Sequence, residues 1–97
     1  MTDDFERSIA REVGAAIRAR RLQAGLSQDQ LSERLGVGPE AVSRMERGVV
    51  MLTIPRLVEL ANALACPVEA FIPKASGSAQ SGANEIARML QPLDKKD

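Results

Sequence analysis

The chain has 97 residues, enough for one small domain, and no net formal charge, since 13 basic residues balance 13 acidic ones. Its single cysteine excludes an internal disulfide, and the absence of histidine removes the commonest general base and metal ligand. No apolar run approaches the ~18 residues of a membrane span, and the acidic start is unlike a signal peptide, so we expect a soluble, cytoplasmic protein.

The first predicted helix follows an acidic start. Residues 1–8 carry three acids and little periodicity, so we expect a flexible tail there. From Ile9 onward, apolar side chains recur at helical spacing until Gly25 ends the helix. The last turns of this helix carry three arginines: Arg18, Arg20 and Arg21. Arg18 and Arg20 either complement the negative end of the helix dipole or contact phosphate.

Residues 27–48 form the most informative stretch, with two short helical patterns on either side of a glycine-bounded turn. Ser27 and Gln30 have the S-x-x-Q spacing of a capping box, in which each side chain bonds the other's backbone N–H. Gly36 can close the first helix in the left-handed conformation. Pro39 suits the first position of the second helix, because its φ is fixed and it needs no hydrogen-bond acceptor. The stretch therefore predicts two helices joined by a tight turn.

The second of these helices has two unlike faces. At about 100° per residue, Val42, Met45 and Glu46 share one face. The opposite face is polar and consists of Glu40, Ser43, Arg44 and Arg47. Glu46 is unusual, because a carboxylate buried without a partner costs several kcal/mol. We expect Arg21, at the edge of the apolar stripe of the first helix, to form an ion pair with it.

An apolar loop, Val49–Leu52, follows. We interpret it as a buried crossing that caps the core; the alternative is an exposed patch at a dimer interface. A fourth helix is predicted from Ile54 to Leu64 by apolar positions at i, i+3, i+4 and i+7. A short fifth helix is predicted over residues 67–72.

The C-terminal part of the sequence divides into two segments. Residues 74–83 are small and polar, which is typical of a flexible linker. Residues 84–97 contain a second amphipathic pattern and a charged end. The apolar stripe of this pattern consists of Ile86, Met89, Leu90 and Leu93. Because so short a helix is marginal alone, it must pack on its own domain, pair with a second copy, or stay unstructured.

The stretch 27–48 resembles the helix-turn-helix of the phage Cro and repressor family, also called the xenobiotic response element family. The matching residues are Arg21, Gly25-Leu26-Ser27-Gln28, Leu31, Leu35-Gly36-Val37, Val42-Ser43 and Met45-Glu46-Arg47-Gly48. The resemblance implies an all-α, five-helix lambda-repressor-like DNA-binding domain over residues 9–73. The sequence departs from the family pattern at Ser32, where alanine is usual, and at Pro39, where many relatives have a polar side chain.

The resemblance also implies a DNA-binding site centred on a recognition helix at about residues 39–47. Gln28 matches a glutamine that contacts a phosphate and braces the base-reading side chains. The recognition positions are Gly38, Pro39, Glu40, Ser43 and Arg44. Arg44 suits guanine O6 and N7, and Glu40 either accepts from cytosine N4 or repels DNA. Ser43 and Arg47 suit phosphate.

These features predict a transcriptional regulator, specifically a repressor that binds a pseudo-palindromic operator in double-stranded DNA as a homodimer. We expect no enzyme, metal or cofactor, because one cysteine cannot build a zinc site and no glycine-rich phosphate loop is present. The alternative is a protein-binding module, such as an antitoxin or regulator subunit. It would use the apolar loop 49–52 and the C-terminal helix, and the zero net charge favours it.

Overall fold

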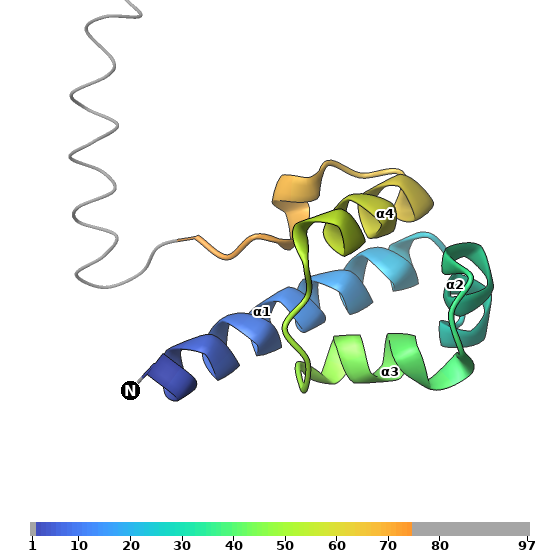
Figure 1. Ribbon diagram of the computed structural model, residues 1–97. Coiled ribbons are helices and arrows are strands. Elements are labelled where there is room, and N and C mark those ends of the chain that lie inside the picture. The colour runs from blue at the N-terminus through green and yellow to red at the C-terminus, as the bar shows by residue number, and fades with distance from the viewer. Residues whose placement is uncertain (1, 75–97) are drawn as a thin grey trace, which may run out of the picture.

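The computed structural model describes residues 2–74, which fold into four α-helices and one short 3₁₀ helix (Figure 1). The elements are α1 (Thr2–Gln23), α2 (Gln28–Leu35), α3 (Pro39–Arg47), α4 (Ile54–Leu64) and η1 (Val68–Phe71). The all-α fold class is confirmed, although the fifth element is a 3₁₀ turn rather than a helix over 67–72. Residues 75–83 of the expected linker and the expected C-terminal segment 84–97 lie outside the described residues. Within residues 2–74, no helix has both the length and the hydropathy to cross a bilayer.

Helix α1 begins earlier than the sequence pattern predicted. We expected residues 1–8 to be a flexible tail, whereas the helix already includes Thr2. Acidic residues at this end are favourable because they face the positive end of the helix dipole. Phe5 and Ile9 also lie one turn apart, a spacing that supports a helix. The prediction of a tail relied on the low periodicity of this short stretch and took neither effect into account.

The helix-turn-helix has the local geometry that its sequence predicts. Ser27 Oγ accepts from the backbone N–H of Gln30 at 3.0 Å, and Gln30 Oε1 accepts from the backbone N–H of Ser27 at 2.8 Å. The capping box is therefore complete at the start of α2. Gly36 ends α2 with φ 71°, in the left-handed region that favours glycine. Pro39 opens α3 directly after the turn.

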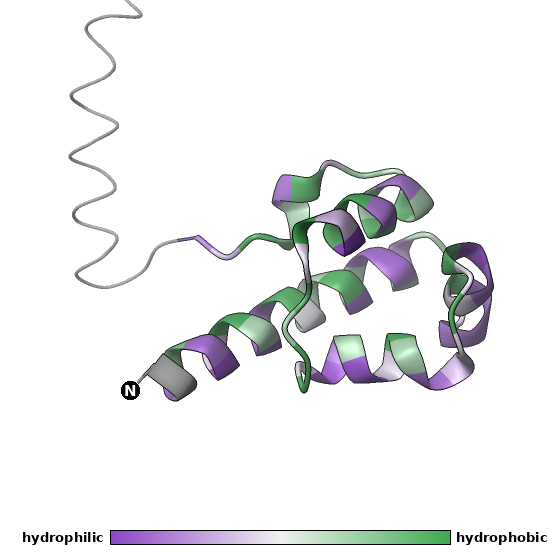
Figure 2. Ribbon diagram, in the orientation of Figure 1, coloured by the Kyte–Doolittle hydropathy of each residue, from purple (hydrophilic) through white to green (hydrophobic). Residues whose placement is uncertain are grey.

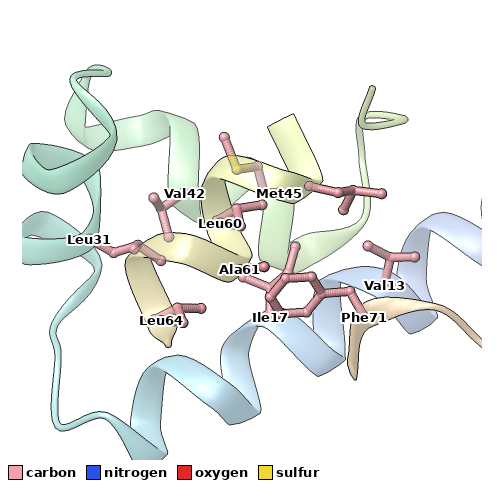
Figure 3. Packing of buried hydrophobic residues seen from close by; sticks show 10 residues of the cluster. Val13, Ile17, Leu31, Val42, Met45, Leu60, Ala61, Leu64 and Phe71 are labelled. Carbon is pink, nitrogen blue, oxygen red and sulfur yellow. The ribbon is translucent and has the colours of Figure 1, made fainter. Parts of the chain in front are cut away.

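The helices enclose one apolar core with α1 through its middle. In the view of Figure 1, α3 lies on one side of α1, and α4 and η1 lie on the other. Figure 2 shows that each helix has both apolar and polar segments along it, as expected for amphipathic helices. The buried cluster in Figure 3 consists of Val13, Ile17, Leu31, Val42, Met45, Leu57, Leu60, Ala61, Leu64 and Phe71. Phe71 is only 1% exposed, so the short η1 contributes a large side chain to the core.

Helices α1 and α3 cross with their backbones in close contact. A Cβ added at Gly14 of α1 would overlap the carbonyl oxygens of Met45 and Glu46. A Cβ added at Gly48, the residue that ends α3, would lie 2.6 Å from Cα of Arg11. Both glycines are therefore needed for this crossing, which sets the position of α3.

The apolar loop Val49–Leu52 does not close over the core as we expected. Val49 and Met51 are 59% and 54% exposed, whereas Val50 and Leu52 are half-buried and pack against the core. Exposed and half-buried side chains therefore alternate along the loop. The interpretation as a buried crossing is therefore wrong for Val49 and Met51.

Candidate nucleic-acid interface

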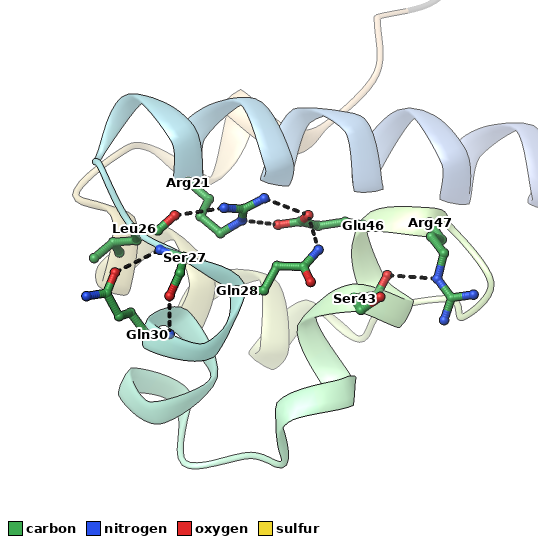
Figure 4. A network of polar contacts seen from close by, with 8 residues as sticks. All are labelled: Arg21, Leu26, Ser27, Gln28, Gln30, Ser43, Glu46 and Arg47. Carbon is green, nitrogen blue, oxygen red and sulfur yellow. Dashed lines mark hydrogen bonds and ion pairs between the residues drawn. The ribbon is translucent and has the colours of Figure 1, made fainter.

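A buried ion pair holds the inner face of α3 against α1 (Figure 4). Arg21 Nε lies 2.5 Å from Glu46 Oε2, and Arg21 Nη2 donates to Glu46 Oε1 at 3.1 Å. The two side chains are only 8% and 3% exposed. Arg21 Nη1 also donates to the carbonyl oxygen of Leu26 at 2.7 Å. The pair expected from the sequence is thus formed, and the guanidinium is shared with the segment that precedes α2.

Gln28 connects this ion pair to the start of α2. Its Nε2 donates to Glu46 Oε1 at 2.9 Å. Because Gln28 is the first residue of α2, the two helices of the helix-turn-helix are joined through one carboxylate. Glu46 therefore accepts from α1 and from α2 while it belongs to α3. The position of α3 is fixed from two sides.

The opposite face of α3 is open to solvent. Glu40, Arg44 and Arg47 are exposed, and Ser43 is half-buried. Arg47 Nε donates to the carbonyl oxygen of Ser43 at 3.3 Å, a bond within the same helix turn. Within residues 2–74, neither Glu40 nor Arg44 takes part in an ion pair. Both side chains are therefore available to a partner outside the domain.

The remaining residues of the predicted site lie at the start of α3. Gly38 is the N-cap, with φ −69° and ψ 162°, and Pro39 is the first helical residue. Both are exposed. The N-cap provides no side-chain hydrogen bond, so the first N–H groups of α3 have no side-chain acceptor from this residue. The predicted site residues of α3 thus share one helix, and Gln28 reaches that helix through Glu46.

Two contributions to this site were not predicted from the sequence. One is Gly14, whose missing side chain lets α3 approach α1. A glycine inside a helix costs about 1 kcal/mol relative to alanine, and that unfavourable choice was the signal available in the sequence. The other is the carbonyl oxygen of Leu26, which accepts a hydrogen bond from Arg21. Every residue has such an oxygen, so the residue types in the sequence do not single it out.

Comparison with known proteins identifies the family. A family model described as Helix-turn-helix matches residues 17–71, more than half of the chain. The chain belongs to the Cro and phage-repressor-like helix-turn-helix family. The match runs from the second half of α1 to the end of η1, and so includes the complete helix-turn-helix. This family consists of DNA-binding transcriptional regulators.

Two relatives carry the family's function in their names. The chain is 37% identical over 59 residues to an uncharacterized transcriptional regulator in the ATPase CF(0) region of Rhodospirillum rubrum, a match that covers 61% of this chain and 55% of the relative. It is 35% identical over 65 residues to an uncharacterized HTH-type transcriptional regulator of Sinorhizobium medicae, covering 67% and 47% respectively. The chain therefore spans about half the length of the curated relatives it matches.

A solved helix-turn-helix protein has a similar fold. The crystal structure of the clp gene regulator ClgR from Corynebacterium glutamicum superposes with a TM-score of 0.64 at 29% identity, covering 86% of this chain and 90% of that one. A second crystal structure of ClgR gives a TM-score of 0.61 at 30% identity, covering 63% and 79%. The fold shared with ClgR therefore agrees with the helix-turn-helix family that the sequence match identifies.

Proposed function

We propose that the chain is a transcriptional repressor that binds a pseudo-palindromic operator as a homodimer, with α3 of each copy in the major groove. The observation that carries the proposal is the contrast between the two faces of α3. Glu46 fixes the inner face through two nitrogen atoms of Arg21 and through Gln28. The outer face presents exposed Glu40 and Arg44. A rigid helix with a free polar face is what major-groove reading requires.

Phosphate contacts would set the position of the domain on the duplex. The amide nitrogen of Gln28 has two N–H groups, and its hydrogen bond to Glu46 uses one of them. The second is free to donate to a phosphate oxygen. Gln28 also stands at the N-terminus of α2, where unpaired backbone N–H groups and the helix dipole favour an anion. Ser43 and Arg47 would contact phosphate from α3.

Base contacts would come from the first turns of α3. Arg44 is exposed and carries a planar guanidinium, which can donate to O6 and N7 of one guanine. Glu40 lies one turn before Arg44 on α3, and its carboxylate can accept a hydrogen bond from cytosine N4. The same carboxylate disfavours bases that present only acceptors at that position. Gly38 and Pro39 offer little polar chemistry, so their contacts would be apolar, for example with a thymine methyl group.

The small size of the reading surface supports a homodimer. One short helix contacts few base pairs, and a two-fold arrangement doubles the site without new sequence. Several large apolar side chains outside the core are exposed and suit a contact between copies. They include Val49 at 59%, Ile54 at 68% and Val58 at 43%. Ile54 and Val58 lie one turn apart on α4, directly after the loop that holds Val49.

The experiment that tests this proposal is selection of binding sites from random duplex DNA, with the mass of the protein in solution measured alongside. We expect a two-fold symmetric motif with half-sites about 10 base pairs apart. The mass should correspond to two chains at the concentration of the selection. A motif without symmetry would contradict the dimeric operator, and no enriched motif would contradict sequence-specific binding.

The exposed side chains of Val49 and Met51 favour a second candidate function, a protein-binding module such as an antitoxin or a regulator subunit. A salt titration separates the two functions. Binding of duplex DNA should weaken steeply as salt rises, because each phosphate contact releases counterions. Binding of an apolar protein surface should change little with salt. The second function is favoured if the partner recovered from cells stays bound at salt concentrations that release DNA.

A further inference from the structure

An apolar groove lies on the part of the domain that α3 does not occupy. It runs between the first turns of α1, the loop before α4 and the residues that follow η1, and it has a volume of about 350 Å³. Its lining includes Phe5, Met51 and Ile72, which are 67%, 54% and 47% exposed. Figure 2 shows the loop between α3 and α4 as an apolar segment that passes α1. Large apolar side chains gathered at one exposed site need an explanation.

The chemistry of the lining indicates what kind of occupant would fit. Every residue that lines the groove has an apolar side chain. Sites for small ligands normally include a few polar groups that fix the orientation of the ligand, and this groove has none among its lining residues. An apolar groove of this kind is suited to the apolar stripe of an amphipathic helix.

The sequence contains such a stripe a short distance along the chain. Ile86, Met89 and Leu90 recur at i, i+3 and i+4, the spacing of helical anchors that enter a groove. Leu93 follows directly after Pro92, which ends the helical pattern. The described chain also ends next to the groove. Ile72 and Pro73 line the groove, and Lys74 is the last residue that the structure describes. The residues between Pro73 and Asn84 are small and polar.

The length of this connection favours an occupant from the same chain over one from a second copy. Residues 74–83 can span at most about 33 Å when extended and have a mean span of about 17 Å as a flexible coil. A segment on a linker of this length has an effective concentration on the order of 1 mM at its own groove. A segment from a chain outside the same homodimer would have to compete at the much lower concentration of the protein itself.

We propose that residues 84–93 bind in the groove of their own chain, with residues 84–91 as a short amphipathic helix, and cover Phe5, Met51 and Ile72. This inference does not rest on DNA binding, because no residue of α3 lines the groove. It gives the apolar stripe of the C-terminal segment a partner within the molecule. It also leaves the outer face of α3 free.

The test uses the full chain with the photoreactive amino acid p-benzoylphenylalanine in place of Met51. A matched control carries the same probe in place of Leu22, which is 56% exposed against 54% for Met51 but does not line the groove. Each protein is prepared as a mixture of ¹⁴N-labelled and ¹⁵N-labelled chains, irradiated and cleaved. Mass spectrometry then identifies the cross-linked peptides and shows whether both halves come from one chain.

We expect the probe at position 51 to cross-link to residues 84–93 of the same chain, and the probe at position 22 not to do so. Leu90→Asp should lower the yield of this cross-link at least about tenfold, because a carboxylate in an apolar groove is strongly unfavourable. Circular dichroism should show that this variant remains folded. Cross-links that join differently labelled chains, cross-links to other segments, or none within 84–93 would each overturn the proposal. An unchanged yield in Leu90→Asp would overturn it as well.

Discussion

Arg21 of α1 and Glu46 of α3, 25 positions apart in the sequence, face each other with two nitrogen–oxygen contacts of 2.5 and 3.1 Å. Because the side chains are only 8% and 3% exposed, the pair is largely shielded from water. The pair therefore couples the helix that would read DNA to the centre of the fold. Removing the pair should therefore lower the free energy of unfolding.

Glu46→Ala should lower the free energy of unfolding by about 3–5 kcal/mol, because it leaves a buried guanidinium without its carboxylate. It also removes the acceptor of the Gln28 amide. Urea unfolding followed by circular dichroism measures the change. A variant that unfolds at the same urea concentration as the parent would show that the pair does not stabilise the fold.

The double variant Arg21→Met, Glu46→Leu serves as the control for this result. It removes both charges together, and apolar pairs of similar volume often replace buried ion pairs at little cost. We expect it to be more stable than Glu46→Ala, although the carbonyl oxygen of Leu26 loses its donor. If the double variant is the less stable of the two, the cost of the single change does not come from the stranded charge.

For Gly14→Ala, the direction of the change in stability separates two opposite expectations. Helix propensity alone predicts a gain of about 1 kcal/mol when alanine replaces glycine inside a helix. The close crossing predicts the opposite, since the added Cβ would overlap the carbonyl oxygens of Met45 and Glu46. We expect a net loss of about 1–3 kcal/mol, the usual cost of overpacking, measured as a lower melting temperature. A melting temperature equal to or above that of the parent would contradict the close crossing.

Ser32→Ala should stabilise the domain. Ser32 is 2% exposed, and its Oγ has no hydrogen-bond partner among the described residues. An unsatisfied buried hydroxyl group costs about 1–3 kcal/mol, and alanine is also the better helix former. We expect the melting temperature to rise, by an amount equivalent to about 1 kcal/mol. A lower melting temperature would indicate that the hydroxyl group makes a stabilising hydrogen bond.

Arg47→Ala should weaken binding to the operator and to unrelated duplex DNA by similar factors. The expected reason is the loss of a phosphate contact, which carries no sequence information. The slope of log K against log salt should fall by about 1. Binding measured at several salt concentrations on both duplexes gives the slope. An unchanged slope would remove Arg47 from the phosphate contacts.

The sequence predicted the structure correctly where a short-range pattern is compatible with only one local structure. The two faces of α3 follow from helical periodicity, and burial of Val42, Met45 and Glu46 agrees with it. A carboxylate on an apolar face demanded a cation, so the ion pair could be inferred across 25 positions of sequence. The capping box and the proline fixed where α2 and α3 begin.

The features that were missed depend on which segments pack together. The exposure of Val49 and Met51 is set by how the loop passes α1, and the sequence alone favoured burial for any apolar run. The role of Gly14 depends on a crossing partner that sequence spacing does not identify. The roles of the α3 residues in DNA reading stay predictions, because they depend on a second molecule.

Discrimination by Arg44 between two duplexes tests the central proposal most directly. The affinity of the parent and of Arg44→Ala is measured for the selected operator and for the same duplex with one guanine–cytosine pair replaced at the position that Arg44 would read. Lys74→Ala, which removes an equal charge outside α3, is the matched control. We predict that Arg44→Ala loses about 1–3 kcal/mol of discrimination at that position while Lys74→Ala keeps it. A folded Arg44→Ala that discriminates as well as the parent at every position of the operator would contradict the account.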